Sequence, residues 1–152
     1  MNRVWTYVIS APLGDVELEQ LQKAGNTFVE HWTAHENKLT ATFEIFKKRI
    51  IVVKVNEDIA NASGCSIDKL TRFIKVSEPM FGIELMNRLL VAYKKDDAVE
   101  VVHSSKVKDL LEQHIISENT IVYNTAAATK TELNSWEQPL KNTWLSKYLV
   151  QV

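Results

Sequence analysis

The stretch Thr40–Val55, which reads TATFEIFKKRIIVVKV, decides what kind of fold the rest of the chain can adopt. Its first part, Thr40–Phe46, alternates polar and apolar residues, as a strand with one buried face does. Its last part, Ile50–Val55, is an almost unbroken run of β-branched residues, which is typical of a central strand. The basic run Lys47–Arg49 between them indicates a solvated turn. The stretch therefore predicts a hairpin that joins a half-buried strand to a central one.

Periodic patterns on either side of this hairpin predict further strands and two helices. Residues 3–9 are rich in Val, Trp, Tyr and Ile and predict a strand. Asp15 is placed to cap a helix whose apolar residues follow helical spacing. After the hairpin, a second helix begins at about Ser66. We expect it to end near Val76 or to restart as a short turn at Pro79, because proline inside a helix removes a hydrogen bond.

Two more strand patterns, at 88–93 and 98–103, complete the order β-α-β-β-α-β with one strand added. This order is the split β-α-β arrangement of ferredoxin-like folds. The predicted fold class is therefore α+β, with an antiparallel sheet in which the strands at 3–9 and 50–55 are central.

The last third of the chain has a different pattern. Short helix and strand signals alternate there, and Thr129–Glu132 fits a capping box at a helix start. Large aromatic residues recur at helical spacing from Trp136 to Tyr148 and predict two short helices that pack on the rest of the protein. We expect one domain, 1–152, built from a ferredoxin-like core, 1–103, and a packed C-terminal extension, 104–152.

Charge and composition restrict the class of function. The 152 residues include 18 Lys and Arg against 19 Asp and Glu, a net charge of −1, so no overall field attracts nucleic acid or an anionic membrane. No window approaches the roughly 20 apolar residues of a membrane span, and the first residues do not resemble a signal peptide. We expect a cytoplasmic protein that needs no cofactor. The lone cysteine agrees with a reducing compartment.

That cysteine lies in the segment Asn61–Lys69, where a small polar loop leads into the second predicted helix. Cys65 precedes Ser66, the expected N-cap, and the positive end of a helix stabilises a thiolate. The alternative is that Cys65 is a small buried apolar residue. Backbone amides at the same helix start, from Ser63 to Ser66, are also suited to binding a carboxylate or phosphate.

The predicted fold brings histidines toward this helix start, because the end of the first helix should approach the beginning of the second. His31 and His35 lie one turn apart there and could activate Cys65 as a nucleophile. The same three side chains could instead bind zinc, although no further ligand is fixed by the spacing. The candidate catalytic residues are therefore Cys65, His31 and His35. The candidate ligand-binding residues are listed here: Ser63, Gly64, Cys65, Ser66 and Asp68.

A third candidate is the sheet face that the two helices leave open. Trp5, Tyr7 or Phe46 on that face would form an apolar patch for a protein partner or a second copy of the chain. The alternative is that the C-terminal extension covers the patch. The leading hypothesis is a non-enzymatic binding or dimerisation domain with an anion site at the helix start. The competing hypothesis is a thiol-dependent enzyme or redox sensor.

The chain resembles a family of uncharacterised bacterial proteins of the same length. The resemblance covers nearly the whole chain and rests on HWTAH (31–35), ASGCSIDK (62–69) and WEQPL (136–140). Some members carry the label ABC transporter ATPase. A P-loop needs a glycine-rich turn that ends in Gly-Lys-Ser/Thr, and none of the four glycines here precedes a lysine. The resemblance therefore implies a family and no ATPase activity.

A second, weaker similarity covers 104–140, whose helix, short strand and Trp136-x-x-Pro139 are similar to GYF-like modules. That family binds peptides through a Gly-Tyr-Phe core. This tripeptide does not occur in the chain, so the similarity implies a packing motif and not peptide recognition.

Overall fold

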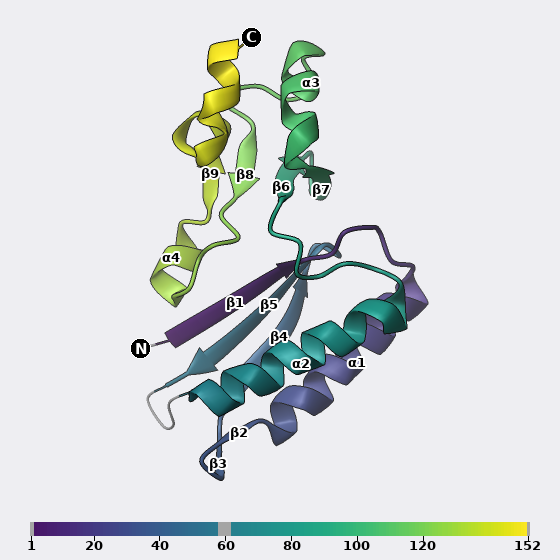
Figure 1. The fold of residues 1–152 in the computed structure, drawn as a ribbon, viewed down its shortest axis with the longest axis vertical. Helices are drawn as coiled ribbons and strands as arrows, with labels where there is room; N and C mark the ends of the chain where they lie inside the picture. The colour runs from purple at the N-terminus through teal and green to yellow at the C-terminus, as the bar shows by residue number, and fades with distance from the viewer. Residues whose placement is uncertain (1, 58–61, 152) are drawn as a thin grey trace.

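The computed structural model describes residues 2–57 and 62–151 and shows an α+β protein with two larger antiparallel sheets and one small two-stranded sheet (Figure 1). Asn61, which was assigned to the loop before the second helix, lies outside the described residues. The first half of the chain forms a three-stranded sheet with two helices along one side. The second half forms a four-stranded sheet with short helices on the other side (Figure 1). Among the described residues, no helix combines the length and apolarity needed to cross a membrane.

The predicted hairpin forms the middle of the first sheet. Strand β5 (Ile50–Asn56) pairs antiparallel with β4 (Thr40–Phe46) on one edge and with β1 (Asn2–Val8) on the other. The turn between β4 and β5 places Lys47 and Lys48 at φ 45° and 67°, the left-handed pair that a tight hairpin requires. The central position of β5 is confirmed.

Arg49 does not belong to a solvated turn, contrary to the prediction for the run Lys47–Arg49. Its side chain is buried, and its Nε and Nη2 atoms donate to the Ile9 carbonyl at 3.3 and 3.0 Å. A buried guanidinium needs such partners, and burial lowers its pKa. Arg49 therefore ties the end of β1 to the hairpin.

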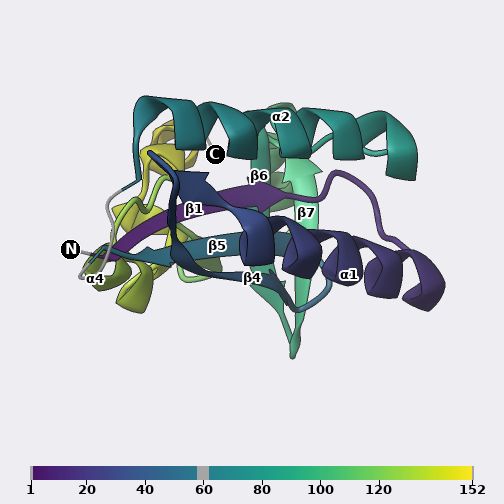
Figure 2. The ribbon, with the colours of Figure 1, turned by 90° about the horizontal axis from the view of Figure 1, so that it is seen from below.

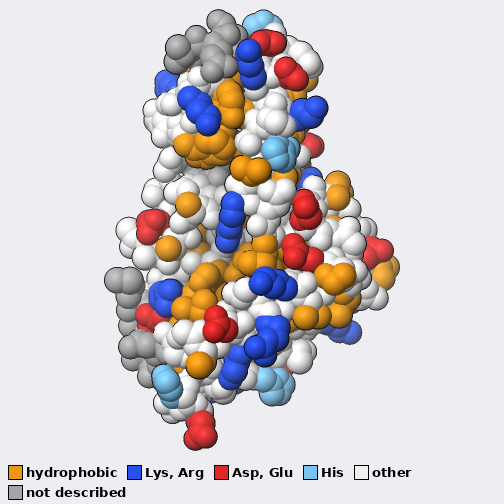
Figure 3. Space-filling model, viewed as in Figure 1, with side chains coloured by type: hydrophobic (Ala, Val, Ile, Leu, Met, Phe, Trp, Pro, Cys, Tyr) orange, Lys and Arg blue, Asp and Glu red, His pale blue; other side chains and the backbone are white. Residues whose placement is uncertain are grey.

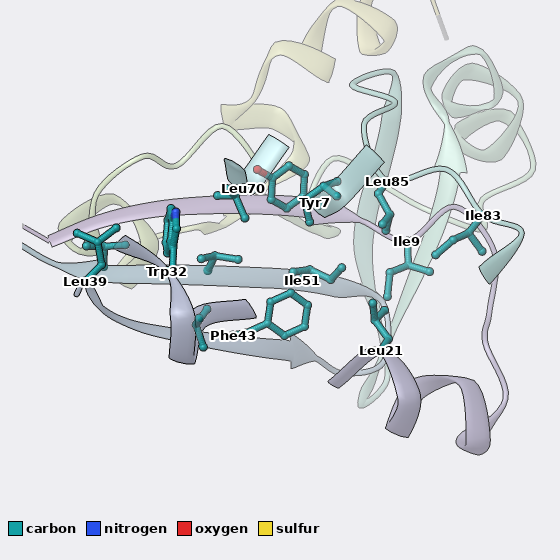
Figure 4. Close-up of a cluster of buried hydrophobic side chains, with 14 of the residues drawn as sticks. Tyr7, Ile9, Leu21, Trp32, Leu39, Phe43, Ile51, Leu70, Ile83 and Leu85 are labelled. Atoms are coloured by element: carbon teal, nitrogen blue, oxygen red, sulfur yellow. The ribbon is translucent and has the colours of Figure 1, made fainter. Parts of the chain in front are cut away.

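Helices α1 (Asp15–His31) and α2 (Gly64–Phe81) lie side by side on one face of this sheet (Figure 2). Between helices and sheet lies the largest buried apolar cluster, in which Leu21, Trp32 and Leu70 are almost fully enclosed (Figure 4). Trp5 and Tyr7 also point into this cluster. Their predicted position on the open face is wrong, because the odd-numbered residues of β1 face the helices and the even-numbered ones face away.

Helix α2 differs from its predicted bounds at both ends. It begins after the N-cap Ser63, three residues before the expected cap. It also continues through Pro79 to Phe81 and ends at Gly82, which has φ 65°. The Ser77 hydroxyl donates to the Phe73 carbonyl at 2.8 Å in the turn before the proline. The left-handed conformation that stops the helix favours glycine, and only Gly82 supplies it there.

The second sheet covers the other face of the first. It contains β6 (Leu90–Lys95), β7 (Ala98–His103), β8 (Ile121–Tyr123) and β9 (Glu137–Pro139), in the order β7-β6-β8-β9. The strands β6 and β7 run steeply across those of the first sheet (Figure 2). A third cluster joins the two sheets, with Val4, Ile50 and Val52 packed on Ala92, Val99 and Tyr123.

This arrangement corrects the predicted sheet order. The expected fourth strand, β6, joins the second sheet, so β1 is an edge strand rather than a central one. Other segments already occupy the free edge of β1. The Val4 amide donates to the Ala128 carbonyl at 3.0 Å, and the Thr6 hydroxyl donates to the Thr125 carbonyl at 2.7 Å.

The C-terminal extension folds mainly as predicted. Short helices α3 (Val107–Glu112) and α4 (Lys130–Asn134) are present, and the Thr129 hydroxyl caps α4 by accepting from the Glu132 amide. The two short helices predicted from Trp136 to Tyr148 are not formed as such: Glu137–Pro139 is strand β9, and the residues after it form two 3₁₀ segments, Leu140–Asn142 and Trp144–Gln151. A further 3₁₀ turn, Ser104–Lys106, precedes α3. Two-residue strands β2 (Thr33–Ala34) and β3 (Asn37–Lys38) follow α1.

Phe46 lies on the face of the first sheet that the second half of the chain covers. Its ring packs against Tyr123 and Trp136, with centroid distances of 5.4 and 5.0 Å. The alternative in which the C-terminal extension covers this face is therefore the observed one. Trp144, in contrast, remains 55% exposed.

Candidate functional site

The end of α1 meets the beginning of α2, as the sequence predicted. The indole nitrogen of Trp32 donates to the Ser66 carbonyl at 2.8 Å, and the Lys69 ammonium approaches the Thr33 hydroxyl at 3.4 Å. The residues of the sequence-predicted site thus belong to one region of the molecule.

Two serines form the cap of α2. Ser63 is the N-cap, its hydroxyl accepts from the Ser66 amide, and its own amide donates to the Ser66 hydroxyl at 2.7 Å. Ser66 is buried, with 1% of its surface exposed. This reciprocal arrangement satisfies helix-start amides internally. This arrangement is a capping box. Within the predicted anion site, the amides of Gly64 and Cys65 take no part in it.

The predicted catalytic side chains do not pair within the described residues. Cys65 is exposed in the first turn of α2, so the alternative of a buried cysteine is wrong. His31 is exposed, and its Nδ1 lies 2.9 Å from the Thr27 carbonyl of its own helix. His35 lies beyond the helix, exposed, at φ 50°. Asp68 is exposed as well.

The zinc alternative has no support in the geometry. Nowhere in 2–57 or 62–151 do three His, Cys, Asp or Glu side chains gather closely enough to hold a metal ion. The exposed thiol of Cys65 therefore belongs to no cluster of metal-binding side chains within the described residues.

A larger hollow lies where the two sheets meet, at the free edge of β1. It is a cleft of about 650 Å³, within the size range of small-molecule sites. Its walls come from five parts of the chain: residues 3–6 of β1, Arg88, residues 90–92 of β6, the segment 122–128, and Gln138 with residues 142–144. We call it the β1 cleft. Its main elements meet at the centre of Figure 1, and Figure 3 shows the molecule narrowing there.

The charged residues known to line the β1 cleft are all positive. Arg3 and Arg88 are the only charged residues that line it, and no Asp or Glu does so among the described residues. In a partly enclosed site, positive charge without a matching carboxylate attracts anions more strongly than it would in open water. The cleft is therefore suited to a negatively charged group.

Arg88 is held in position by the first sheet. Its Nη1 atom donates to the Thr6 carbonyl at 3.0 Å, and its guanidinium lies over the Tyr7 ring, 5.6 Å from the ring centroid. A guanidinium has five N–H donors, and these contacts use one of them. The remaining donors are available for a ligand.

Arg3 lies on the same strand and is held less tightly. Its guanidinium stacks over the Trp5 ring at 4.9 Å from the centroid, and its Nη1 is 3.8 Å from a carboxylate oxygen of Glu57. An ion pair of this length at a partly exposed position is weak. Glu57 therefore reduces the positive charge of Arg3 without removing it.

The opposite wall carries neutral polar groups and one large aromatic ring. Asn124 accepts from the Ala126 amide through its side-chain oxygen at 3.1 Å, which directs its NH₂ group elsewhere. Asn142 and Gln138 add two further amides, and the exposed Trp144 closes this side. These groups can hold the uncharged part of a ligand.

Two tyrosines near the cleft have raised pKa values. Burial raises the pKa of Tyr7 to about 12, an effect that the positive charge of Arg88 partly offsets. Burial also raises the pKa of Tyr123, and the Glu137 carboxylate adds to that shift. Both phenols are thus neutral at physiological pH and contribute no negative charge to the cleft.

Sequence reasoning did not find the β1 cleft. Arg88 was predicted to be the first residue of a strand, and Arg3 to belong to a strand covered on one face and partly on the other. No local pattern set either arginine apart. Their convergence depends on the contact between two sheets, which no short motif encodes.

Comparisons of the chain with protein-family models, with curated proteins and with solved structures found no match. The site is therefore interpreted from its own geometry.

Proposed function

We propose that this protein is a non-enzymatic binding protein whose ligand, an anion, occupies the β1 cleft. The observation that carries the proposal is the position of Arg88, which lines a cleft that has no carboxylate among its described lining residues and is held by a hydrogen bond and a ring contact. A prepositioned guanidinium binds a carboxylate or phosphate with little further loss of side-chain entropy. No arrangement of nucleophile and base accompanies it in the described residues, which favours binding over catalysis.

The proposal includes two broader expectations from the sequence. A cytoplasmic location is supported by the lone exposed cysteine, since free thiols persist in reducing compartments. A ferredoxin-like relationship of the first half is supported by the strand order β1-β5-β4, in which β5 separates the two strands that α1 connects.

The test is isothermal titration calorimetry with benzoate, with its neutral analogue benzamide, and with inorganic phosphate. We expect the anions to bind and benzamide to bind at least about tenfold more weakly, because a charge-assisted hydrogen bond contributes roughly 1.5–3 kcal/mol. Arg88→Met should weaken anion binding by a similar factor. Equal binding of benzoate and benzamide would contradict the proposal.

The matched control is Arg72→Met. Arg72 is exposed on α2 and does not line the cleft, so this variant changes net charge by the same amount at a distant place. It should leave anion binding unchanged. If both variants weaken binding equally, the effect reflects overall charge and the β1 cleft is not the site.

A second candidate function is thiol chemistry at Cys65, favoured by one observation: the thiol is exposed in the first turn of α2. Its test is the rate of alkylation by iodoacetamide between pH 5 and pH 10, in the native protein and in a His31→Ala, His35→Ala double variant. Activation by the histidines predicts a midpoint near neutrality that rises in the variant. An identical profile in both proteins would remove the histidines from any catalytic role.

A further inference from the structure

The two arginines of the β1 cleft rest on neighbouring aromatic rings of β1. Arg3 lies over the Trp5 ring and Arg88 over the Tyr7 ring. Trp5 and Tyr7 are two residues apart on the same face of β1, and a strand rises about 3.3 Å per residue, so the two rings are roughly 7 Å apart along the strand. Both arginines also line the same cleft, whose volume of about 650 Å³ is that of a small-molecule site.

Both guanidinium groups are held by contacts that a flexible surface arginine lacks. Arg88 is fixed by the Thr6 carbonyl and the Tyr7 ring, and Arg3 by the Trp5 ring and Glu57. Because each group is already partly ordered, a ligand that bridges them loses less side-chain entropy than it would on a mobile surface. A fixed pair of charges also discriminates by distance.

The other lining residues within the described parts of the chain supply no third charge. They offer the amides of Asn124, Gln138 and Asn142 and the exposed ring of Trp144. A cation would be repelled by the two arginines. A neutral ligand would form no charge-assisted hydrogen bond with either guanidinium group and would bind more weakly than an anion.

We propose that the ligand of the β1 cleft carries two anionic groups on one short scaffold. One group binds at Arg88, the other at Arg3, and the connecting body lies toward Asn124, Asn142 and Trp144. This inference rests on the proposed anion-binding function and adds the number and spacing of the charges. Dicarboxylates and diphosphates share this chemistry, and they form separate arms of the test.

Glu57 gives the proposal a distinctive consequence. Its carboxylate is 3.8 Å from Arg3 and competes with the second anionic group for that arginine. Removing this competing charge by Glu57→Gln should tighten the binding of a dianion. A monoanion bound at Arg88 lies farther from Glu57 and should gain less from Glu57→Gln than the dianion does.

The experiment is calorimetry of the full chain with the dicarboxylates from succinate to suberate, each compared with the monocarboxylate of the same length, and of pyrophosphate compared with phosphate. We expect one dicarboxylate length, or pyrophosphate, to bind about tenfold more tightly than its partner with a single acidic group, the gain of one added charge-assisted hydrogen bond. Arg3→Met should abolish that preference, because the dianion should lose much more affinity than the monoanion and fall to the level of its single-group partner. Arg3→Lys, which keeps the charge but loses the planar fork, should retain part of it.

The outcomes separate this inference from the proposed function. Equal binding of monoanions and dianions, with Arg88→Met still weakening both, would overturn the two-charge ligand and leave the anion-binding function standing. Failure of every anion to bind at millimolar concentration would overturn both. Thermal melting of each variant identifies any that has lost its fold, and Glu57→Gln then provides the independent readout, because the account predicts a gain rather than a loss.

Discussion

The two faces of the β1-β5-β4 sheet are covered in different ways. One face is covered by α1 and α2, which come from the same half of the chain, and the side chains between them form a closed cluster around Trp32 and Leu70. The other face is covered by a second sheet from the other half of the chain. That contact is smaller, and at the edge of β1 it leaves the β1 cleft.

Geometry explains the difference. Two helices can align along a twisted sheet over its whole length, whereas two sheets that cross at a large angle stay in contact only near the crossing and diverge at their corners. At such a corner, polar groups replace apolar ones. Thr6 bonds to Thr125 there, and Arg88 bonds to Thr6. The comparison teaches that this fold closes its helix-covered face and leaves an accessible site at the edge of β1, where the two faces of the sheet meet.

The largest expected effect tests how closely the helix-covered face is packed. A Cβ at Gly25 of α1 would lie 2.2 Å from the Phe43 ring of β4, so Gly25→Ala should lower the free energy of unfolding by about 2–3 kcal/mol, as overpacking of a core does. Gly64→Ala is the control, because a Cβ there has no atom within 4 Å and the substitution should be neutral or stabilise by up to about 1 kcal/mol. Urea denaturation measures both. Similar free energies of unfolding for the two variants would show that the helix-covered face is not closely packed at Gly25.

The next effect concerns pH and sharpens the contrast at Tyr7, which lies in the helix-side cluster beneath Arg88. Its pKa is raised from 10.0 to about 12, so the folded protein holds the phenol proton more tightly than the unfolded chain does. The resulting contribution of Tyr7 to the free energy of unfolding is fully present below pH 10. It is lost as the pH rises toward 12, a loss on the order of 2–3 kcal/mol. Tyr7→Phe should reduce the alkaline loss of stability in denaturation curves at pH 9 to pH 12. Burial also raises the pKa values of Tyr93 and Tyr123, so part of the loss should persist. Identical slopes in the native protein and the variant would contradict the assignment.

A smaller effect compares two buried hydroxyls on the second face. The Thr6 hydroxyl bonds to the Thr125 carbonyl at 2.7 Å, so Thr6→Val leaves that carbonyl without its partner and should cost about 1–2 kcal/mol. The Tyr123 hydroxyl is buried and, within the described residues, forms no hydrogen bond of normal geometry, although the Glu137 carboxylate is close enough to affect its pKa. Tyr123→Phe should therefore change stability by less than about 0.5 kcal/mol. Thermal denaturation that ranked the two variants in the opposite order would show that Thr6 does not hold the two sheets together.

The sequence predicted the parts of the fold that depend on local patterns. The alternation in Thr40–Phe46 and the β-branched run Ile50–Val55 identified the hairpin, and Thr129–Glu132 identified a helix start. The prediction that β1 is a central strand was wrong, because edge and central strands can have the same residue pattern when both of their faces are covered. The course of β1 beside segment 125–129 depends on contacts more than a hundred residues apart, such as Thr6 with Thr125.

The candidate site shows the same limit. Cys65, His31 and His35 were chosen because their residue types suggest chemistry, and the fold does bring their helix ends together. It does not pair the side chains, because His31 bonds to its own helix and His35 lies past the helix end. Arg3 and Arg88 carried no such signal individually. Their role in the candidate site depends on a cleft that forms only when the two sheets pack together.

The most direct test of the central claim is a ¹H–¹⁵N NMR titration of the full chain with adipate, which maps where an anion binds. The account predicts that shift changes concentrate in segment 124–128, in residues 142–144 and at the Arg88 side chain, and that they saturate with one binding constant. The helix start at Ser63–Ser66 should remain unaffected. Changes that concentrate at Ser63–Ser66 instead, or that scatter over the surface without saturation, would contradict the assignment of the β1 cleft as the binding site.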